Sequence, residues 1–156
     1  MAMQPSSLKQ QRGSALLEAL IAILIFSMGV IALMGLQAAS IKNSIDAKYR
    51  ADASYLANQI IGQMWVDRAN LDNYAHNPIV GTVCAPTGTA STLTKVTTDW
   101  LPQIAAALPG ATSAKQQISV TTPLANTRQV TVTICWQGPQ ETNPHNFVAT
   151  AQINTP

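Results

Sequence analysis

The chain has 156 residues and a formal net charge of +2 at pH 7, a length that allows one domain, or one small domain plus a long helix. Charged residues make up 10% of the sequence, well below the usual quarter. The small net charge argues against a nucleic-acid-binding protein, as does the lack of Lys/Arg clusters interleaved with aromatic residues. We therefore expect no nucleic acid among its partners.

A long apolar run near the N-terminus contains one carboxylate. Glu18 is the only charged residue between Ser14 and Lys42, and residues 19–41 are uncharged. As a helix, this run would span about 35 Å, enough to cross a bilayer. A charged side chain in a membrane-spanning segment costs about 3 kcal/mol or more unless it finds a partner. The position of Glu18 therefore needs an explanation.

Three interpretations of this run compete. A secretory signal peptide has a shorter apolar core followed by a small-residue cleavage site, which residues 36–38 (Leu-Gln-Ala) match poorly. A plain single-pass anchor leaves Glu18 unexplained. Cleavage after Gly13 would instead keep the helix in the mature protein and create a positive amino terminus at Ser14. This third interpretation alone gives Gly13, Ser14 and Glu18 related roles.

The helix is expected to continue beyond the apolar run, from about Ser14 to about Arg68. No proline interrupts residues 6–77. Apolar residues recur there at spacings of three and four, which predicts an amphipathic second half that covers the C-terminal domain. The residues of this apolar stripe are Ile41, Ile45, Tyr49, Ala53, Leu56, Ile60 and Met64.

Two glycines interrupt the apolar half of the predicted helix. Gly29 and Gly35 each cost about 1 kcal/mol relative to alanine in a helix interior. One interpretation is close helix packing along a stripe of small residues. The other is a weak point at which the helix bends or unwinds during assembly. The sequence leaves both open.

The C-terminal part is predicted to form a small antiparallel sheet, so the fold class is α+β. Residues 71–98 are rich in Pro, Gly, Thr and Ser and are predicted to be a long loop. A short helix is expected from Thr98, its capping residue, to about Leu108. Alternating apolar residues then predict a meander of three strands at Gln117–Thr121, Gln129–Trp136 and Phe147–Ile153, packed on the amphipathic helix half.

The two cysteines, Cys84 and Cys135, lie downstream of the apolar run. In an exported domain they predict a disulfide, which would contribute roughly 4 kcal/mol by the loop-entropy argument. The alternative is a pair of buried free thiols in a cytosolic fold.

No catalytic constellation, cofactor motif or metal-ligand spacing is evident in the sequence. The two histidines, His76 and His145, are expected to be polar surface residues. We therefore expect no enzyme activity, no cofactor and no metal ion.

The N-terminal motif resembles the processing signal of type IV pilins and pseudopilins. Their precursors have a short basic leader ending in Gly and then an apolar helix with Glu at its fifth position. Here the matching residues are Lys9, Arg12, Gly13, Ser14 and Glu18. Most members have Phe where this chain has Ser14. The resemblance implies cleavage after Gly13 by a prepilin peptidase and N-methylation of Ser14.

The resemblance extends to minor pilins of the PilV type. Residues 29–37 are similar to the stretch after the membrane-buried part of that family, and residues 50–64 to its next helical segment. Trp100, residues 108–110 and residues 134–136 resemble its C-terminal layout. Major pilins usually have a helix-breaking proline close to where this chain has Gly35.

This resemblance implies a cleaved leader (1–13), an apolar transmembrane and assembly helix (14–40) and a periplasmic globular domain (41–156). The subunit would cross the inner membrane once and later join a pilus at the cell surface. Expected partners are prepilin peptidase, membrane lipid, the major pilin and other minor pilins, with which it would help initiate assembly. The alternatives are a type II secretion pseudopilin and a membrane-anchored periplasmic binding module.

Overall fold

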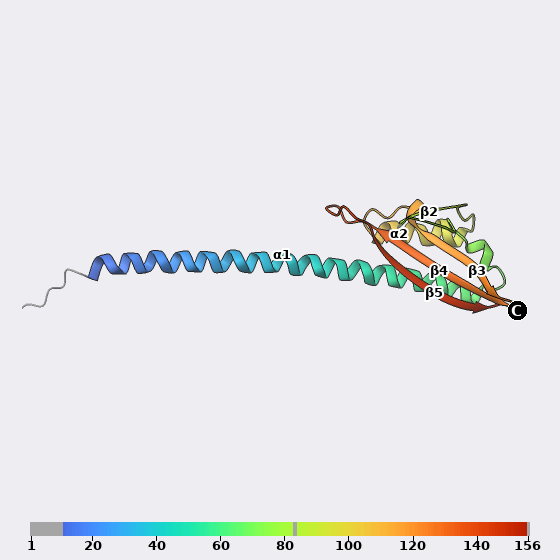
Figure 1. The fold of residues 1–156 in the computed structure, drawn as a ribbon, viewed down its shortest axis with the longest axis horizontal. Coiled ribbons are helices and arrows are strands. Elements are labelled where there is room, and N and C mark those ends of the chain that lie inside the picture. The colour runs from blue at the N-terminus through green and yellow to red at the C-terminus, as the bar shows by residue number, and fades with distance from the viewer. Residues whose placement is uncertain (1–10, 83, 156) are drawn as a thin grey trace, which may run out of the picture. The chain divides into compact units, whose positions relative to one another are not determined.

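The structure is a computed structural model that describes residues 11–82 and 84–155. The fold is α+β, with a long N-terminal helix packed against C-terminal antiparallel sheets (Figure 1). The chain divides into two compact units, the first ending at Ile45 and the second beginning at Asp46.

Helix α1 (Gln11–Val66) ends close to the expected Arg68. The predicted apolar stripe packs on the core only from Tyr49 onward, and the prediction is wrong for Ile41 and Ile45, which are exposed. Leu, Ile, Ala and Met dominate the first half of α1, and they are compatible with an uninterrupted helix. It continues through Gly29 and Gly35 without a break. Within the described residues, it is the one helix long and apolar enough to cross a membrane.

The main sheet of the second unit is the predicted antiparallel meander. It consists of β3 (Gln117–Leu124), β4 (Thr127–Trp136) and β5 (His145–Asn154), in the order β3-β4-β5. A tight turn joins β3 to β4, with Asn126 at a φ of 62°, a left-handed conformation that Asn tolerates better than most residues. The strands extend a few residues beyond the ranges that the alternating pattern predicted.

The core of this unit lies between the amphipathic half of α1, the sheet and a short second helix. Trp100, only 2% exposed, donates a hydrogen bond from its indole Nε1 to the Leu56 carbonyl of α1 at 2.9 Å. This bond satisfies the polar atom of a large buried side chain. The fully buried apolar residues contributed by α1 and the sheet include Ala53, Ala57, Ile60, Met64, Ile118, Val130, Val132, Ile134 and Ile153.

The segment predicted as one long loop has more structure than expected. It contains a 3₁₀ turn (Leu71–Tyr74) and a two-stranded hairpin formed by β1 (Ile79–Thr82) and β2 (Ala85–Thr87). These strands are short and mostly exposed, so they lack the apolar alternation that indicates a strand. A further 3₁₀ turn, Ser113–Lys115, precedes β3.

The predicted start of the short helix at Thr98 is wrong. A π-helical turn (Lys95–Trp100) leads directly into α2 (Leu101–Ala107), so Thr98 lies inside the helical segment. The Leu93 carbonyl accepts hydrogen bonds from the backbone N–H groups of Val96 and Thr97. Burial of Val96 and Trp100 stabilises this earlier start, because tertiary packing outweighs a capping preference worth about 1 kcal/mol.

A polar cluster closes the C-terminal end of α1. The Asp67 carboxylate accepts hydrogen bonds from Asn70 Nδ2 (2.8 Å), the Tyr74 hydroxyl (3.1 Å) and Lys95 Nζ (3.5 Å). The Asn70 bond, supported by Tyr74 and Lys95 and opposed by partial desolvation, holds the pKa of the Asp67 carboxyl below its ordinary 3.8. Asp67 thus links the end of the helix to the segment that follows it.

This cluster predicts a pH-dependent contribution to stability. Because the folded-state pKa of Asp67 is lowered, its contribution is present above the unfolded-state pKa, near 4, and is lost as the pH falls through the folded value. Asp67→Asn should therefore lower the unfolding temperature at pH 7 and have a smaller effect below pH 3. Thermal unfolding followed by circular dichroism at both pH values tests this. An equal effect at both values would contradict it.

Candidate processing and assembly site

The residues of the predicted processing signal lie in the first turns of α1. Gly13, Ser14 and Glu18 are all exposed, and Ser14 and Glu18 share one helical face because they are four residues apart. The signal residue Lys9 and the side chain of Arg12 are outside the described part of the structure. A shallow hollow along this face is lined by Gly13, Ser14, Leu17, Glu18, Ile21, Ala22 and Ile25.

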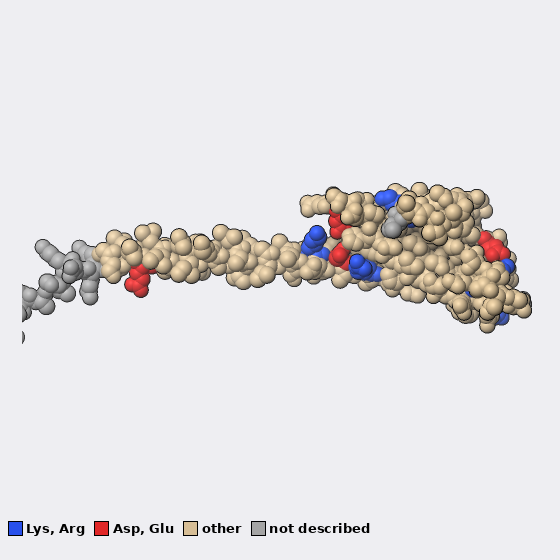
Figure 2. All heavy atoms as spheres, in the orientation of Figure 1, with Lys and Arg blue, Asp and Glu red and all other residues tan. Residues whose placement is uncertain are grey.

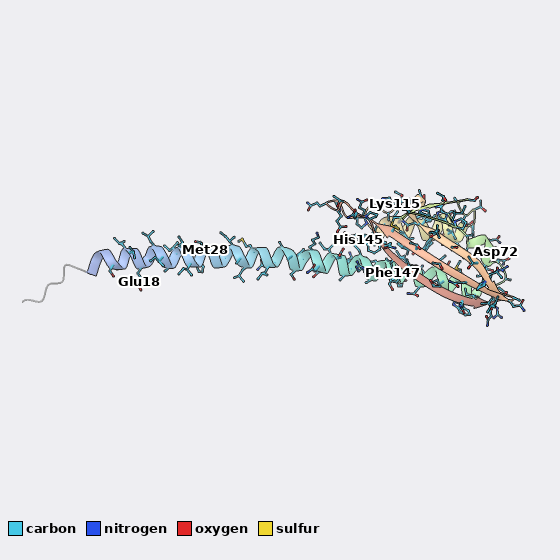
Figure 3. All side chains as sticks on the ribbon, in the orientation of Figure 1. Glu18, Met28, Asp72, Lys115, His145 and Phe147 are labelled. Carbon is cyan, nitrogen blue, oxygen red and sulfur yellow. A yellow bond between two sulfur atoms is a disulfide. The ribbon has the colours of Figure 1, made fainter. Side chains whose placement is uncertain are left out.

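Glu18 is a single charge on an apolar surface. It is the only charged residue in residues 13–41, and Figure 2 shows one acidic side chain on an otherwise uncharged stretch of helix. Figure 3 shows Glu18 projecting from the helix. Within the described part of the chain its carboxylate has no hydrogen bond or ion pair, so any partner in an apolar environment must come from elsewhere.

The surface around Glu18 is not suited to water. From Gly13 to Ile45 every side chain is exposed except that of Val30, which is half-buried. Burying one large aliphatic side chain is worth about 1.5–3 kcal/mol, so this unit must be covered by lipid or protein. Its exposed large apolar residues include Leu16, Leu17, Leu20, Ile21, Ile23, Leu24, Ile25, Phe26, Met28, Ile31, Leu33, Met34 and Leu36.

Gly29 and Gly35 lie on this exposed surface. Among the described residues, a Cβ built at either position would meet nothing within 4 Å, so packing within this part of the chain requires neither glycine. If close packing accounts for them, the packing partner is another molecule. The intact helix does not decide between packing and unwinding.

In the second unit, a disulfide joins the β1–β2 hairpin to the sheet. Cys84 and Cys135 are bonded, with their Cα atoms 5.6 Å apart. Cys135 lies in β4 and is fully buried. The Gln116 side chain hydrogen-bonds to both the N–H and the carbonyl of Cys135, at 2.8 and 3.0 Å. The disulfide therefore connects a mostly exposed hairpin to a rigid strand.

The prediction that both histidines are polar surface residues is wrong for His76. Its side chain is 2% exposed. Nε2 lies 3.0 Å from the Ser113 carbonyl, and Nδ1 accepts a hydrogen bond from the Ser91 N–H at 3.1 Å. The backbone of His76 also pairs with Ile118. His76 therefore has a structural role, since it connects three segments that are distant in sequence.

His145 is half-buried, and the structure places two carboxylates next to it. Asp46 of α1 and Glu141 of the β4–β5 loop each offer an oxygen, and these atoms and one His145 nitrogen all lie within 4.8 Å of one another. Glu141 and His145 are four residues apart in the sequence, and this short spacing was the one available signal that these two side chains could meet. Asp46 is too distant in sequence for any pattern to indicate it.

Comparisons of the chain with protein-family models, curated protein sequences and solved structures found no match. The architecture itself resembles that of type IV pilin-like proteins, with a long apolar N-terminal helix followed by a small antiparallel sheet and a disulfide.

The disulfide predicts a measurable loss of stability when it is removed. It closes a loop between residues 51 positions apart, so the variant Cys84→Ala/Cys135→Ala should lose roughly 4 kcal/mol in the free energy of unfolding. Urea unfolding of the full chain in detergent, followed by tryptophan fluorescence, measures this. Reductant should destabilise the original chain but not the variant. An unchanged midpoint in the variant would contradict the prediction.

Proposed function

We propose that this chain is a minor type IV pilus subunit of the PilV type, which helps initiate pilus assembly near the tip together with other minor pilins. The observation that carries the proposal is the placement of Glu18. It lies one helical turn after Ser14, the residue that follows Gly13, on an exposed apolar helix. No catalytic role is proposed, since the chemistry is performed on the chain at Gly13 and Ser14.

Processing is the first step of the proposed mechanism. A prepilin peptidase cleaves after Gly13 and the new amine of Ser14 is N-methylated, which leaves the positive charge of the amine in place. The helix then stores the subunit in the inner membrane, with the second unit in the periplasm. An oxidising compartment favours the Cys84–Cys135 disulfide, in agreement with this orientation.

Assembly follows from the energetics of the exposed apolar surface. When the subunit leaves the membrane, its apolar half must be covered, and helices of neighbouring subunits provide the same kind of surface. Burial of apolar area contributes about 25 cal/mol per Å² but is not directional. The hydrophobic effect therefore drives bundling without setting the axial position of one helix against the next.

Glu18 supplies the missing specificity. In the bundle its carboxylate meets the positive amine of Ser14 on a neighbouring subunit, so both buried charges are neutralised. A buried ion pair adds little net stability, whereas a buried charge without a partner costs about 3–5 kcal/mol. Registers that leave Glu18 unpaired are therefore penalised.

Two other functions use the same N-terminal features. A type II secretion pseudopilin would share the processing signal but would co-purify with secretion machinery instead of pili. A membrane-anchored periplasmic binding module would keep the residues before Ser14. The disulfide and the structured segment between residues 71 and 98 favour the pilin over the pseudopilin.

The proposal predicts that Glu18→Val is processed normally but enters pili at least about tenfold less, a change that corresponds to about 1.4 kcal/mol. Immunoblots of sheared pili and of membranes measure incorporation and processing separately. Ser27→Ala is a matched control in the same apolar half, because the Ser27 hydroxyl donates a hydrogen bond to the Ile23 carbonyl of its own helix, at 2.7 Å. Wild-type levels of Glu18→Val in pili would refute the role of Glu18.

A further inference from the structure

The cluster of Asp46, Glu141 and His145 combines residues from three elements. Asp46 is on α1, Glu141 is in the loop after β4, and His145 is the first residue of β5 (labelled in Figure 3). All three are half-buried, and one potential ligand atom from each lies within 4.8 Å of the other two. Nε2 of His145 is 2.9 Å from Oε2 of Glu141.

The loop holds Glu141 in place before any ligand binds. The Gly138 N–H donates a hydrogen bond to Oε2 of Glu141 at 3.0 Å, and the Gln137 side chain donates to the Glu141 carbonyl at 2.8 Å. A Cβ at Gly138 would lie only 2.8 Å from the same Oε2. The glycine therefore leaves the space that this carboxylate occupies.

The imidazole of His145 is also fixed in orientation. Its ring stacks on Trp136, with the ring centroids 5.7 Å apart and the planes 19° from parallel. Trp136 and His145 are paired residues in the β4–β5 register. Hydrogen bonds and packing that orient ligand side chains in this way typically support metal affinity.

We propose that Asp46, Glu141 and His145 form a binding site for a divalent transition-metal ion of the Zn²⁺ type. Carboxylate oxygens and imidazole nitrogens are both ligands of Zn²⁺, whereas Ca²⁺ and Mg²⁺ prefer oxygen ligands alone. Tetrahedral bonds of about 2.1 Å place ligand atoms about 3.4 Å apart. Nε2 of His145 and Oε2 of Glu141 are 2.9 Å apart, so these two atoms would separate slightly to admit the ion, and all three potential ligand atoms already lie within 4.8 Å of one another. Water fills the remaining coordination.

The ion would cross-link the β4–β5 loop to α1. The start of the loop is held by the Gln137 N–H, which donates a hydrogen bond to the Pro109 carbonyl at 2.9 Å, and the disulfide holds the neighbouring β4 residue Cys135. Metal binding would therefore stabilise the second unit. This inference does not depend on the proposed pilus function, because it concerns residues that take no part in processing or in the apolar helix surface.

The test is titration of Zn²⁺ into the full chain in detergent, without a histidine tag and freed of metal by a chelator. Isothermal titration calorimetry should show one ion per chain at pH 7.5, and the unfolding temperature should rise with added Zn²⁺. Asp46→Asn and His145→Ala should each weaken binding by about tenfold or more. Asp99→Asn, which changes an exposed carboxylate elsewhere, should leave affinity unchanged.

Asp46→Asn is the more informative variant, because it keeps the stacking of His145 on Trp136 and the hydrogen bonds of Glu141. His76 does not compete for the ion, since both of its ring nitrogens are engaged. Absence of saturable binding at one equivalent would overturn the proposal, as would equal affinity in Asp46→Asn and the original chain. The former result would indicate that His145 and the carboxylates form an ion-pair cluster without metal.

Discussion

An exposed apolar helix surface that carries one carboxylate is the constraint on which the rest of this structure depends. The surface from Gly13 to Ile45 requires a cover of lipid or protein, and Glu18 requires a partner wherever that cover excludes water. A bilayer satisfies the first requirement but not the second. A bundle of like helices with free amino termini at Ser14 satisfies both, which is why cleavage after Gly13 is central to the proposed function.

In the second unit, the C-terminal half of α1 is part of a folded domain. The apolar stripe of α1 after Asp46 is buried under the sheet and α2, and Trp100 is hydrogen-bonded to the helix backbone at Leu56. The disulfide ties the β1–β2 hairpin to this core. In the proposed function, this division lets the chain present its apolar half to neighbouring subunits while the other half keeps its own folded structure.

The sequence predicted the parts of the fold that follow a regular period. The spacing from Ala53 to Met64 predicted the buried face of α1, and the alternation in residues 129–136 predicted β4. The hairpin at β1 and β2 was missed because its short, exposed strands have no such period.

Burial of His76 depends on backbone and side-chain contacts with residues distant in the sequence, such as Ser113. In the same way, no pattern could bring Asp46 to Glu141 and His145. For the N-terminal motif, the structure shows that Ser14 and Glu18 share an exposed helical face. Cleavage after Gly13 stays a prediction.

Intact mass spectrometry of the chain extracted from membranes, with and without reduction, tests the central claim most directly. The account predicts a chain that begins at Ser14, carries one additional methyl group and gains about two daltons on reduction, as one disulfide requires. A chain that keeps the residues before Ser14, or that begins beyond Ala38, would contradict the account. Either result would remove the amine that Glu18 needs and leave an anchored or secreted domain.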